Sequence, residues 1–375
     1  DVTVAYCSLQ GAEPGVDPEF GVEVAWDIPL LDGYRWVHPP NRSPKPGLGR
    51  FFGLFNPGLW TLVQRGAFDV VVCFGYRAAS FWIAALAAKR SGAALVFATD
   101  AHTLAPRDGA RWKLPLKRAA LPRIFALADA ALAPSSRTAA FLHALGVPKG
   151  CVFLTPYVVD NEFFARRAAV ADRREVRRRW GVPEDALVAL FVGKLAPWKR
   201  PADLLEAAAL VSGLHVVLAG EGPLRRILED RARASDLAGR ARFLGFVNQS
   251  ALPEAYAAAD VLVLPSEYEP FGVVVNEAFS CGVPAVVSDA CGSAGDLVRD
   301  GVTGYIVPVG DGTTLADRLA RLGADPDLRL AMGEAARKRI ADWGPQQNAE
   351  AFARACLEIA ARKRASIRSV ARAAG

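Results

Sequence analysis

Short apolar runs of strand type alternate along the chain with stretches rich in alanine and leucine, through two successive halves. This pattern is typical of parallel β-sheets that helices cover on both faces. The expected strands are 2–7, 22–27, 69–75, 94–99, 130–134 and 152–155 in the first half, and 187–194, 214–219, 241–244, 260–264, 284–288 and 304–308 in the second. The sequence therefore predicts an α/β protein with two doubly wound domains that face a cleft.

The 375 residues are enough for two domains of ordinary size. Helices are expected between the strands of the second half at 201–211, 223–236, 251–258 and 314–322, and a last one at about 346–364. We place the boundary between the halves near Pro156–Asp160. This gives a first Rossmann-like domain at 1–158, a second one at 159–345, and a C-terminal helix with its tail at 346–375, crossing back towards the first domain.

Composition narrows the class of protein. No apolar run reaches the ~18–20 residues that span a bilayer, and no signal peptide is visible at the N-terminus. The six cysteines are scattered without a Cys-x-x-Cys pair, which favours reduced thiols in a cytoplasmic protein. No nucleic-acid-binding motif accompanies the net charge of +6, so we expect no nucleic-acid partner.

Basic residues are concentrated in two stretches. They are Arg107, Arg111, Lys113, Lys117, Arg118 and Arg123, among apolar residues such as Trp112, and Arg362, Lys363, Arg364, Arg368 and Arg372. One interpretation is a solvated helix face and a frayed tail. The other is a surface that meets anionic lipid or an anionic acceptor, which would bring the protein to the inner face of the membrane.

Glu269 and Glu277 stand with seven residues between them, directly after the predicted strand 260–264. Glu269 is expected in a loop, and Glu277 about two turns along a short helix that ends near Gly282. Carboxylates accept hydrogen bonds from hydroxyl pairs, and a helix N-terminus offers free N–H groups to an anion. The pair therefore predicts a ligand that is part polyol and part phosphate, as a nucleotide sugar is.

Three other strand ends would meet the same ligand, because ligands of open α/β sheets bind beyond the carboxyl ends of the strands. Lys194 and Lys199 follow the strand 187–194 and could converge on a diphosphate, neutralising it without a metal. Gly220-Glu221-Gly222 forms a tight turn after the next strand. The backbone of Gly245-Phe246-Val247 could lie along a nucleobase edge; Phe246 could equally well pack in the core.

Together these motifs resemble the retaining glycosyltransferases of family 4, which have the two-domain GT-B fold. The similarity is strong over 150–345 and looser over 1–150, where the first domain lacks the strand, glycine loop and helix with which family members usually begin. We expect roughly 20–30 residues of such a unit to be missing from the natural start.

The resemblance implies a role for each matching residue. Glu277 would hold the ribose hydroxyls, and Glu269 would lie against the donor sugar. The other donor-binding positions would be Gly193, Lys194, Lys199, Gly222, Phe246, Val247, Phe271, Gly272 and Val273. The family more often has arginine at the position of Lys194, which would bind phosphate in bidentate fashion.

In the first domain, Asp100 and His102 follow the predicted strand 94–99. Similar enzymes often place a histidine or an acid there, close to the transferred sugar and the acceptor. His102 is our catalytic candidate, with Asp100 as the alternative for that role; the competing interpretation is a structural histidine.

The function implied is transfer of a hexose-type sugar, with retained configuration, from a nucleoside diphosphate sugar to a hydroxyl of a glycan or lipid-linked acceptor. No Asp-x-Asp motif stands at a strand end, so neither a metal nor a cofactor is expected. The alternatives are a nucleotide-sugar epimerase of the same architecture, a phosphorylase-like enzyme with lysine-bound pyridoxal cofactor, for which no lysine is marked, and a catalytically silent binding module.

Overall fold

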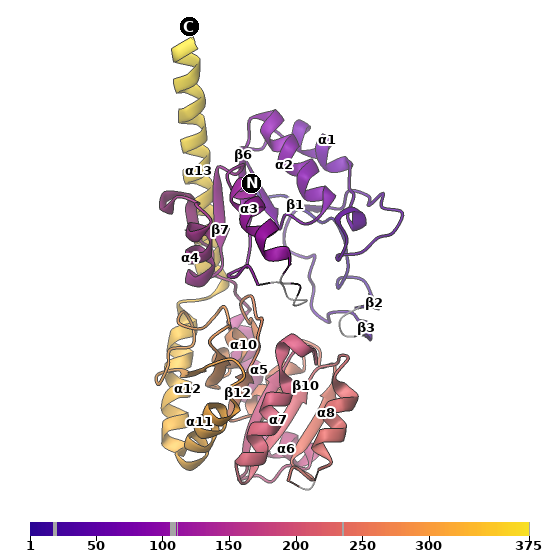
Figure 1. Cartoon of the computed structure of the whole chain (residues 1–375), viewed down its shortest axis with the longest axis vertical. Helices are drawn as coiled ribbons and strands as arrows, with labels where there is room; N and C mark the ends of the chain where they lie inside the picture. The colour runs from indigo at the N-terminus through magenta and orange to yellow at the C-terminus, as the bar shows by residue number, and fades with distance from the viewer. Residues whose placement is uncertain (18–20, 106–109, 111, 235, 375) are drawn as a thin grey trace. The chain divides into compact units, whose positions relative to one another are not determined.

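The computed structural model describes residues 1–17, 21–105, 110, 112–234 and 236–374 (Figure 1). The chain divides into two compact units. The first unit consists of Asp1–Glu13, Pro29–Pro156 and Asn348–Gly375, and the second of Pro14–Ile28 and Tyr157–Gln347. None of the described helices is both long enough and apolar enough to cross a membrane.

The second unit is built on a sheet of six parallel strands. They are β9 (Leu187–Val192), β10 (Leu214–Ala219), β11 (Ala241–Gly245), β12 (Val261–Leu264), β13 (Ala285–Ser288) and β14 (Gly304–Val307), in the order β11-β10-β9-β12-β13-β14. Along β9, Val188, Leu190 and Val192 belong to one buried cluster, whereas Ala189 and Phe191 belong to another. Because successive side chains of a strand point to opposite faces, both faces of this sheet are buried.

Helices supply the two covering layers of the second unit. Their bounds are α5 Asn161–Val170, α6 Arg173–Trp180, α7 Pro201–Leu210, α8 Arg225–Ala232, α9 Leu252–Ala258, α10 Val274–Ser280, α11 Gly312–Ala324 and α12 Pro326–Ala341. Aspartate side chains cap four of them: Asp160, Asp172, Asp311 and Asp325 each accept a hydrogen bond from a backbone N–H of the first turn.

The first unit has a sheet of four parallel strands in the order β5 (Val70–Phe74), β6 (Ala94–Ala98), β7 (Ala130–Ala133) and β8 (Val152–Leu154). Its helices are α1 Gly58–Arg65, α2 Ala79–Ser91, α3 Lys113–Phe125, α4 Ser136–Ala144 and α13 Pro345–Ala374. The architecture of two parallel sheets covered by helices confirms the predicted fold class.

The C-terminal helix α13 covers one face of this four-stranded sheet (Figure 1). Ala355 and Ile359 are buried against residues of β6 and β7, and the Lys363 ammonium lies 2.8 Å from a carboxylate oxygen of Asp129. Arg364 pairs with Asp69 in the same way, at 2.9 Å. Lys363 and Arg364 of the basic C-terminal stretch therefore lie on a helix that packs on the sheet, and the interpretation as a frayed tail is wrong for these two residues.

The chain before residue 38 differs from the expected pattern. β1 (Val4–Ala5) pairs in parallel with β4 (Trp36–Val37), in a separate two-stranded ladder. β2 (Gly15–Val16) pairs with β3 (Glu23–Val24), and this pair is antiparallel. The prediction that 22–27 is a strand of the parallel sheet is wrong. The reason is that Gly21, with φ of +72°, turns the chain directly before β3, which then pairs locally.

Candidate functional site

The strand order of the second unit fixes where a ligand can bind. Counted along the chain, the strands run 3-2-1-4-5-6, so the direction of winding reverses between β9 and β12. Open α/β sheets bind ligands beyond the carboxyl ends of the strands at such a switch point. Lys194 and Lys199 follow β9, and Glu269 follows β12. The two motifs singled out in the sequence therefore lie at the two strands that form the switch point.

Backbone hydrogen bonds join the loops that follow these two strands. The carbonyl of Trp198 accepts hydrogen bonds from the backbone N–H groups of Glu267 and Tyr268, at 2.9 and 3.2 Å. Next to this connection, the Lys199 ammonium donates to a carboxylate oxygen of Glu269 in an ion pair. The two side chains are only 18% and 9% exposed. A cation and an anion therefore lie beyond the carboxyl ends of the central strands with little water around them.

The loop from Glu269 to Val273 is held by backbone contacts. The Glu269 carbonyl accepts a hydrogen bond from Gly292 N–H at 2.9 Å, and Phe271 packs edge-on against Tyr157. Gly272 has φ of +90°, a conformation that glycine adopts without strain. This delays the helix, since α10 begins only at Val274. Glu277 is thus one turn along the helix, whereas two turns were expected.

Glu277 is buried beneath this loop with two hydrogen-bond donors. The Tyr256 hydroxyl donates to one carboxylate oxygen at 2.6 Å, and the Gln249 amide to the other at 3.4 Å. Burial raises the pKa of Glu277 to about 7, although both hydrogen bonds act in the opposite direction. The carboxyl group therefore changes charge near neutral pH. Sequence reasoning missed both donors, because Tyr256 has the pattern of a core residue of a helix.

The glycines of the Gly220-Glu221-Gly222 turn have a packing explanation. A Cβ at Gly220 would lie 1.8 Å from the Gly193 carbonyl oxygen, and one at Gly222 would lie 2.6 Å from that of Leu195. Both contacts are too short for any side chain. These glycines therefore let the loop after β10 press against the loop that carries Lys194, whether or not Gly222 also contacts a ligand.

Lys194 and Phe246 contact a segment that sequence reasoning did not connect with the site. The Lys194 ammonium lies 3.5 Å from a carboxylate oxygen of Asp17. The ring of Phe246, directly after β11, lies 5.6 Å from the ring of Trp26. Val247 packs against the core of the second unit. Both Asp17 and Trp26 belong to the second unit despite their early position in the chain.

Asp100 and His102 belong to the first unit, where they follow β6. The Asp100 carbonyl accepts a hydrogen bond from the Thr138 hydroxyl at 3.3 Å. Both residues are partly buried. The fold thus puts them at the carboxyl end of a strand, as expected, and their catalytic role stays a prediction.

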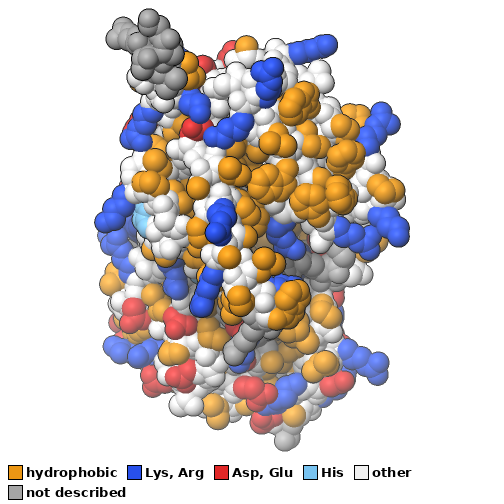
Figure 2. Space-filling view, turned by 45° about the horizontal axis from the view of Figure 1, so that its top comes forward, with side chains coloured by type: hydrophobic (Ala, Val, Ile, Leu, Met, Phe, Trp, Pro, Cys, Tyr) orange, Lys and Arg blue, Asp and Glu red, His pale blue; other side chains and the backbone are white. Residues whose placement is uncertain are grey.

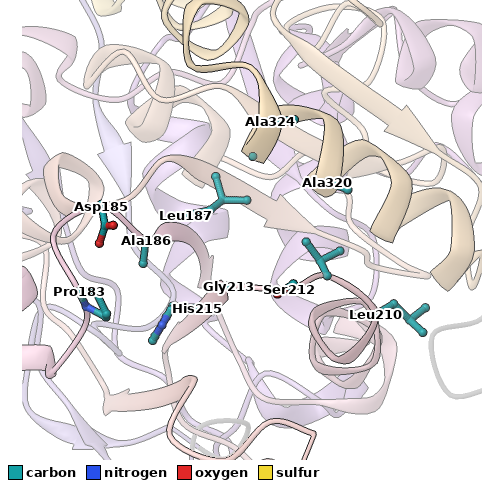
Figure 3. Close-up of a pocket in the computed structure, with 12 residues that line it drawn as sticks. Pro183, Asp185, Ala186, Leu187, Leu210, Ser212, Gly213, His215, Ala320 and Ala324 are labelled. Carbon is teal, nitrogen blue, oxygen red and sulfur yellow. The ribbon is translucent and has the colours of Figure 1, made fainter.

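A hollow of about 610 Å³ lies at the amino ends of the strands of the six-stranded sheet, opposite the ends that carry Lys199 and Glu269 (Figure 3). Its lining includes Leu187 and His215, at the amino ends of β9 and β10. Burial, with neighbouring arginines, lowers the pKa of His215. This hollow is separate from the residues predicted to bind the donor. Within the described ranges, no three His, Cys, Asp or Glu side chains are grouped as metal ligands.

Two family models match the chain. Residues 172–339 match the model for glycosyl transferases group 1, and residues 1–158 match that for a glycosyl transferase 4-like domain. The D-inositol 3-phosphate glycosyltransferase of Geodermatophilus obscurus is 39% identical over 212 residues, which are 52% of this chain and 46% of that protein. The α-D-kanosaminyltransferase of Streptomyces kanamyceticus is 36% identical over 168 residues, 44% and 43% of the two chains.

The chain thus spans about half the length of these curated relatives. Among solved structures, Anabaena Alr3699/HepE in complex with UDP and glucose is similar with a TM-score of 0.64 and 20% identity, covering 89% of this chain and 86% of that one. At 20% identity, this similarity is evidence for the fold alone.

Proposed function

The chain belongs to the family 4 glycosyltransferases, and on this premise we propose that it transfers a hexose from a nucleoside diphosphate sugar to an acceptor hydroxyl with retained configuration. The observation that carries the proposal is the Lys199–Glu269 ion pair at the switch point between β9 and β12. A diphosphate needs a cation there, and a reacting sugar carbon needs a negative charge close by. The solved relative that holds UDP and glucose makes UDP-glucose the first donor to try.

In this mechanism the chain's own residues bind and polarise the donor. Lys199, with Lys194, takes the diphosphate and stabilises the negative charge that grows on it as the sugar–oxygen bond breaks. Glu269 faces the positive charge that develops at the anomeric carbon. The acceptor oxygen attacks that carbon from the side of the departing diphosphate, whose oxygen takes the acceptor proton. Glu277 accepts hydrogen bonds from the ribose hydroxyls.

We propose that the acceptor is a hydroxyl of a glycan or lipid-linked molecule at an anionic membrane surface. Trp112 and Leu116, at the start of α3, are 74% and 65% exposed, whereas Arg107 and Arg111 of the same basic stretch lie outside the described residues. Residues 33–68 contain five Lys and Arg and no Asp or Glu. Within them Phe51, Phe52 and Trp60 are exposed.

Figure 2 shows hydrophobic side chains gathered in the upper right of the view, where Figure 1 has α1 and α2, with Lys and Arg side chains at their edge. Aromatic rings beside cations favour the interface of an anionic bilayer. We expect the protein to sediment with anionic vesicles at low salt and much less with neutral ones. Phe52→Glu should weaken that binding, and equal sedimentation with both vesicle types would contradict the proposal.

The experiment for the reaction is a panel of nucleoside diphosphate sugars with EDTA present, scored for released nucleoside diphosphate. We expect release from one donor, and a fall in turnover of about a hundredfold or more in Glu269→Gln. Donor binding should persist in that variant.

Glu267→Gln is the matched control, because Glu267 lies in the same loop with a side chain that is 65% exposed. Unchanged turnover in Glu269→Gln would contradict the proposed role of Glu269. A rearranged sugar formed without acceptor would identify an epimerase instead, and binding without release from any donor would favour a silent binding module.

A further inference from the structure

Residues 14–28 pack on the second unit, although the residues on either side of them belong to the first. The segment contains the β2–β3 pair. Its partners in the second unit are residues just beyond the carboxyl ends of β9 and β11. These are the strand ends at which a nucleotide is proposed to bind.

One end of the segment is fastened to the loop after β11 by reciprocal hydrogen bonds. The Asn248 side chain donates to the Ala25 carbonyl at 2.7 Å and accepts from Asp27 N–H at 3.2 Å. The Asp27 carboxylate in turn accepts from Ser250 N–H at 3.1 Å and from the Ser250 hydroxyl. Both the segment and the loop contribute backbone groups and side chains to these hydrogen bonds. Trp26, which lies between Ala25 and Asp27, is therefore held in a defined position.

Trp26 meets the loop at the residue proposed to lie beside the nucleobase. Its ring lies 5.6 Å from that of Phe246, with an angle of 58° between the ring planes. Three residues further along the same loop, Gln249 donates to the carboxylate of Glu277, the proposed ribose ligand. The loop 245–250 therefore connects Trp26 with the carboxylate that would hold the sugar of the nucleoside.

The other end of the segment reaches the proposed diphosphate site. Asp17 lies 3.5 Å from the ammonium of Lys194. Because β11, β10 and β9 are neighbours in the sheet, the segment spans the strand ends along which a nucleoside diphosphate would extend from base to phosphate.

We propose that the described residues of this segment, 14–17 and 21–28, form a wall of the nucleotide site, and that Trp26 contacts the nucleobase and helps to select it. The inference rests on the proposed function, because it takes the loop 245–247 as the base-reading element. Aromatic rings offer an apolar face on which bases stack, and the contact with Phe246 holds the ring of Trp26 in a fixed orientation.

The test is to titrate UDP, GDP, uridine and pyrophosphate into the wild-type protein and into Trp26→Ala, by calorimetry. We expect Trp26→Ala to weaken the preferred nucleoside diphosphate and its nucleoside by about five- to a hundredfold, and to leave pyrophosphate binding within about twofold. Trp26→Phe should restore most of the loss. Leu330→Ala, at an exposed residue of α12 in the second unit, is the control and should leave nucleotide affinity unchanged.

Three results would overturn the inference, and they separate its failure from that of the proposed function. Nucleotide affinity unchanged in Trp26→Ala would remove Trp26 from the site while leaving the glycosyltransferase proposal intact. An equal loss of nucleotide and pyrophosphate would indicate general damage to the site rather than a base contact. No nucleotide binding by the wild-type protein would defeat the proposed function and the inference with it.

Discussion

The second unit has a buried ion pair at each end of β12, and the two differ in how fully their hydrogen bonds are used. Before the strand, Arg177 and Asp260 are 2.7 Å apart, and the Arg177 side chain is 2% exposed. Beyond the strand stand Lys199 and Glu269. Both pairs are low in exposure and both join separate elements. Burial alone therefore does not tell which of them holds the fold and which is available to a ligand.

The pair before β12 is saturated by protein atoms. Arg177 also donates to the carbonyls of Ala258, Glu184 and Ala186, at 2.6–2.9 Å. Asp260 also accepts from Arg173 and from Val188 N–H. Arg177 thus uses four of its five N–H donors on protein atoms, and Asp260 accepts three hydrogen bonds from protein donors.

The pair beyond β12 is unsaturated. An ammonium group has three N–H donors, and within the described part of the chain Lys199 Nζ uses one of them, on Glu269. The two remaining N–H donors can be given to oxygens of a diphosphate. The comparison teaches that hydrogen-bond saturation separates a structural ion pair from a functional one in this unit.

The largest expected effect comes from breaking the saturated pair. Arg177→Ala removes the buried donor of three carbonyls and leaves the Asp260 carboxylate with only Arg173 and Val188 N–H. This should lower the free energy of unfolding of the second unit by about 3–5 kcal/mol. Urea unfolding measures this. Nucleotide affinity of the molecules that stay folded should not change.

Arg174→Ala is the control for that experiment, since Arg174 lies on the same helix and pairs with Glu184 in an exposed contact. Its effect should stay below about 1 kcal/mol. If the two variants were equally stable, saturation would not be what distinguishes the ends of β12. The comparison would also fail if Arg177→Ala abolished nucleotide binding without destabilising the protein.

A smaller effect is expected from pH, at Glu277. Its pKa of about 7 means that Glu277 becomes charged between roughly pH 6 and 8. A charged carboxylate accepts stronger hydrogen bonds from ribose hydroxyls than a neutral carboxyl group does. Donor affinity should therefore rise with pH over this range, by up to about tenfold per unit. Nucleotide-sugar titrations at several pH values measure this, and Glu277→Gln should give a flat profile.

The free energy of unfolding should fall as pH rises, whereas donor affinity should increase. The folded protein keeps a proton on Glu277 that the unfolded chain releases at its ordinary pKa near 4.5. The unfolded state therefore binds fewer protons, and the free energy of unfolding falls as pH rises from about 4.5 to 7. Glu277→Gln should lose this part of the pH dependence. A variant that retained the full slope would show that another group titrates.

The fold and much of the candidate site were predictable because their signals are local. The strands of the second unit lie within two residues of their predicted bounds, since strands buried on both faces form continuous apolar runs. The residues at the ends of β9 and β12 followed from the rule that ligands bind there. The start of α10 was not predictable in this way, because the positive φ of Gly272, which delays the helix, has no signal in the local sequence.

Other features depend on distant residues and leave no local signal. Trp26 and Phe246 are 220 positions apart, and no pattern near either one announces their contact. Tyr256 looks like any apolar residue of a helix, although its hydroxyl orients Glu277. The spacing of Glu269 and Glu277 located the carboxylates, but the groups that tune them could be found only from the folded chain.

The packing of α13 has a consequence for how the protein is made on the ribosome. The face of β6 and β7 is closed by Ala355 and Ile359, which are synthesised more than 220 residues after Leu132. At ~5–20 residues per second this leaves an apolar sheet face uncovered for roughly ten to forty-five seconds. During that interval the nascent chain exposes alanine, valine and leucine side chains to solvent, and a chaperone has time to bind. Synthesis of the first unit therefore starts before that of the second unit and finishes after it.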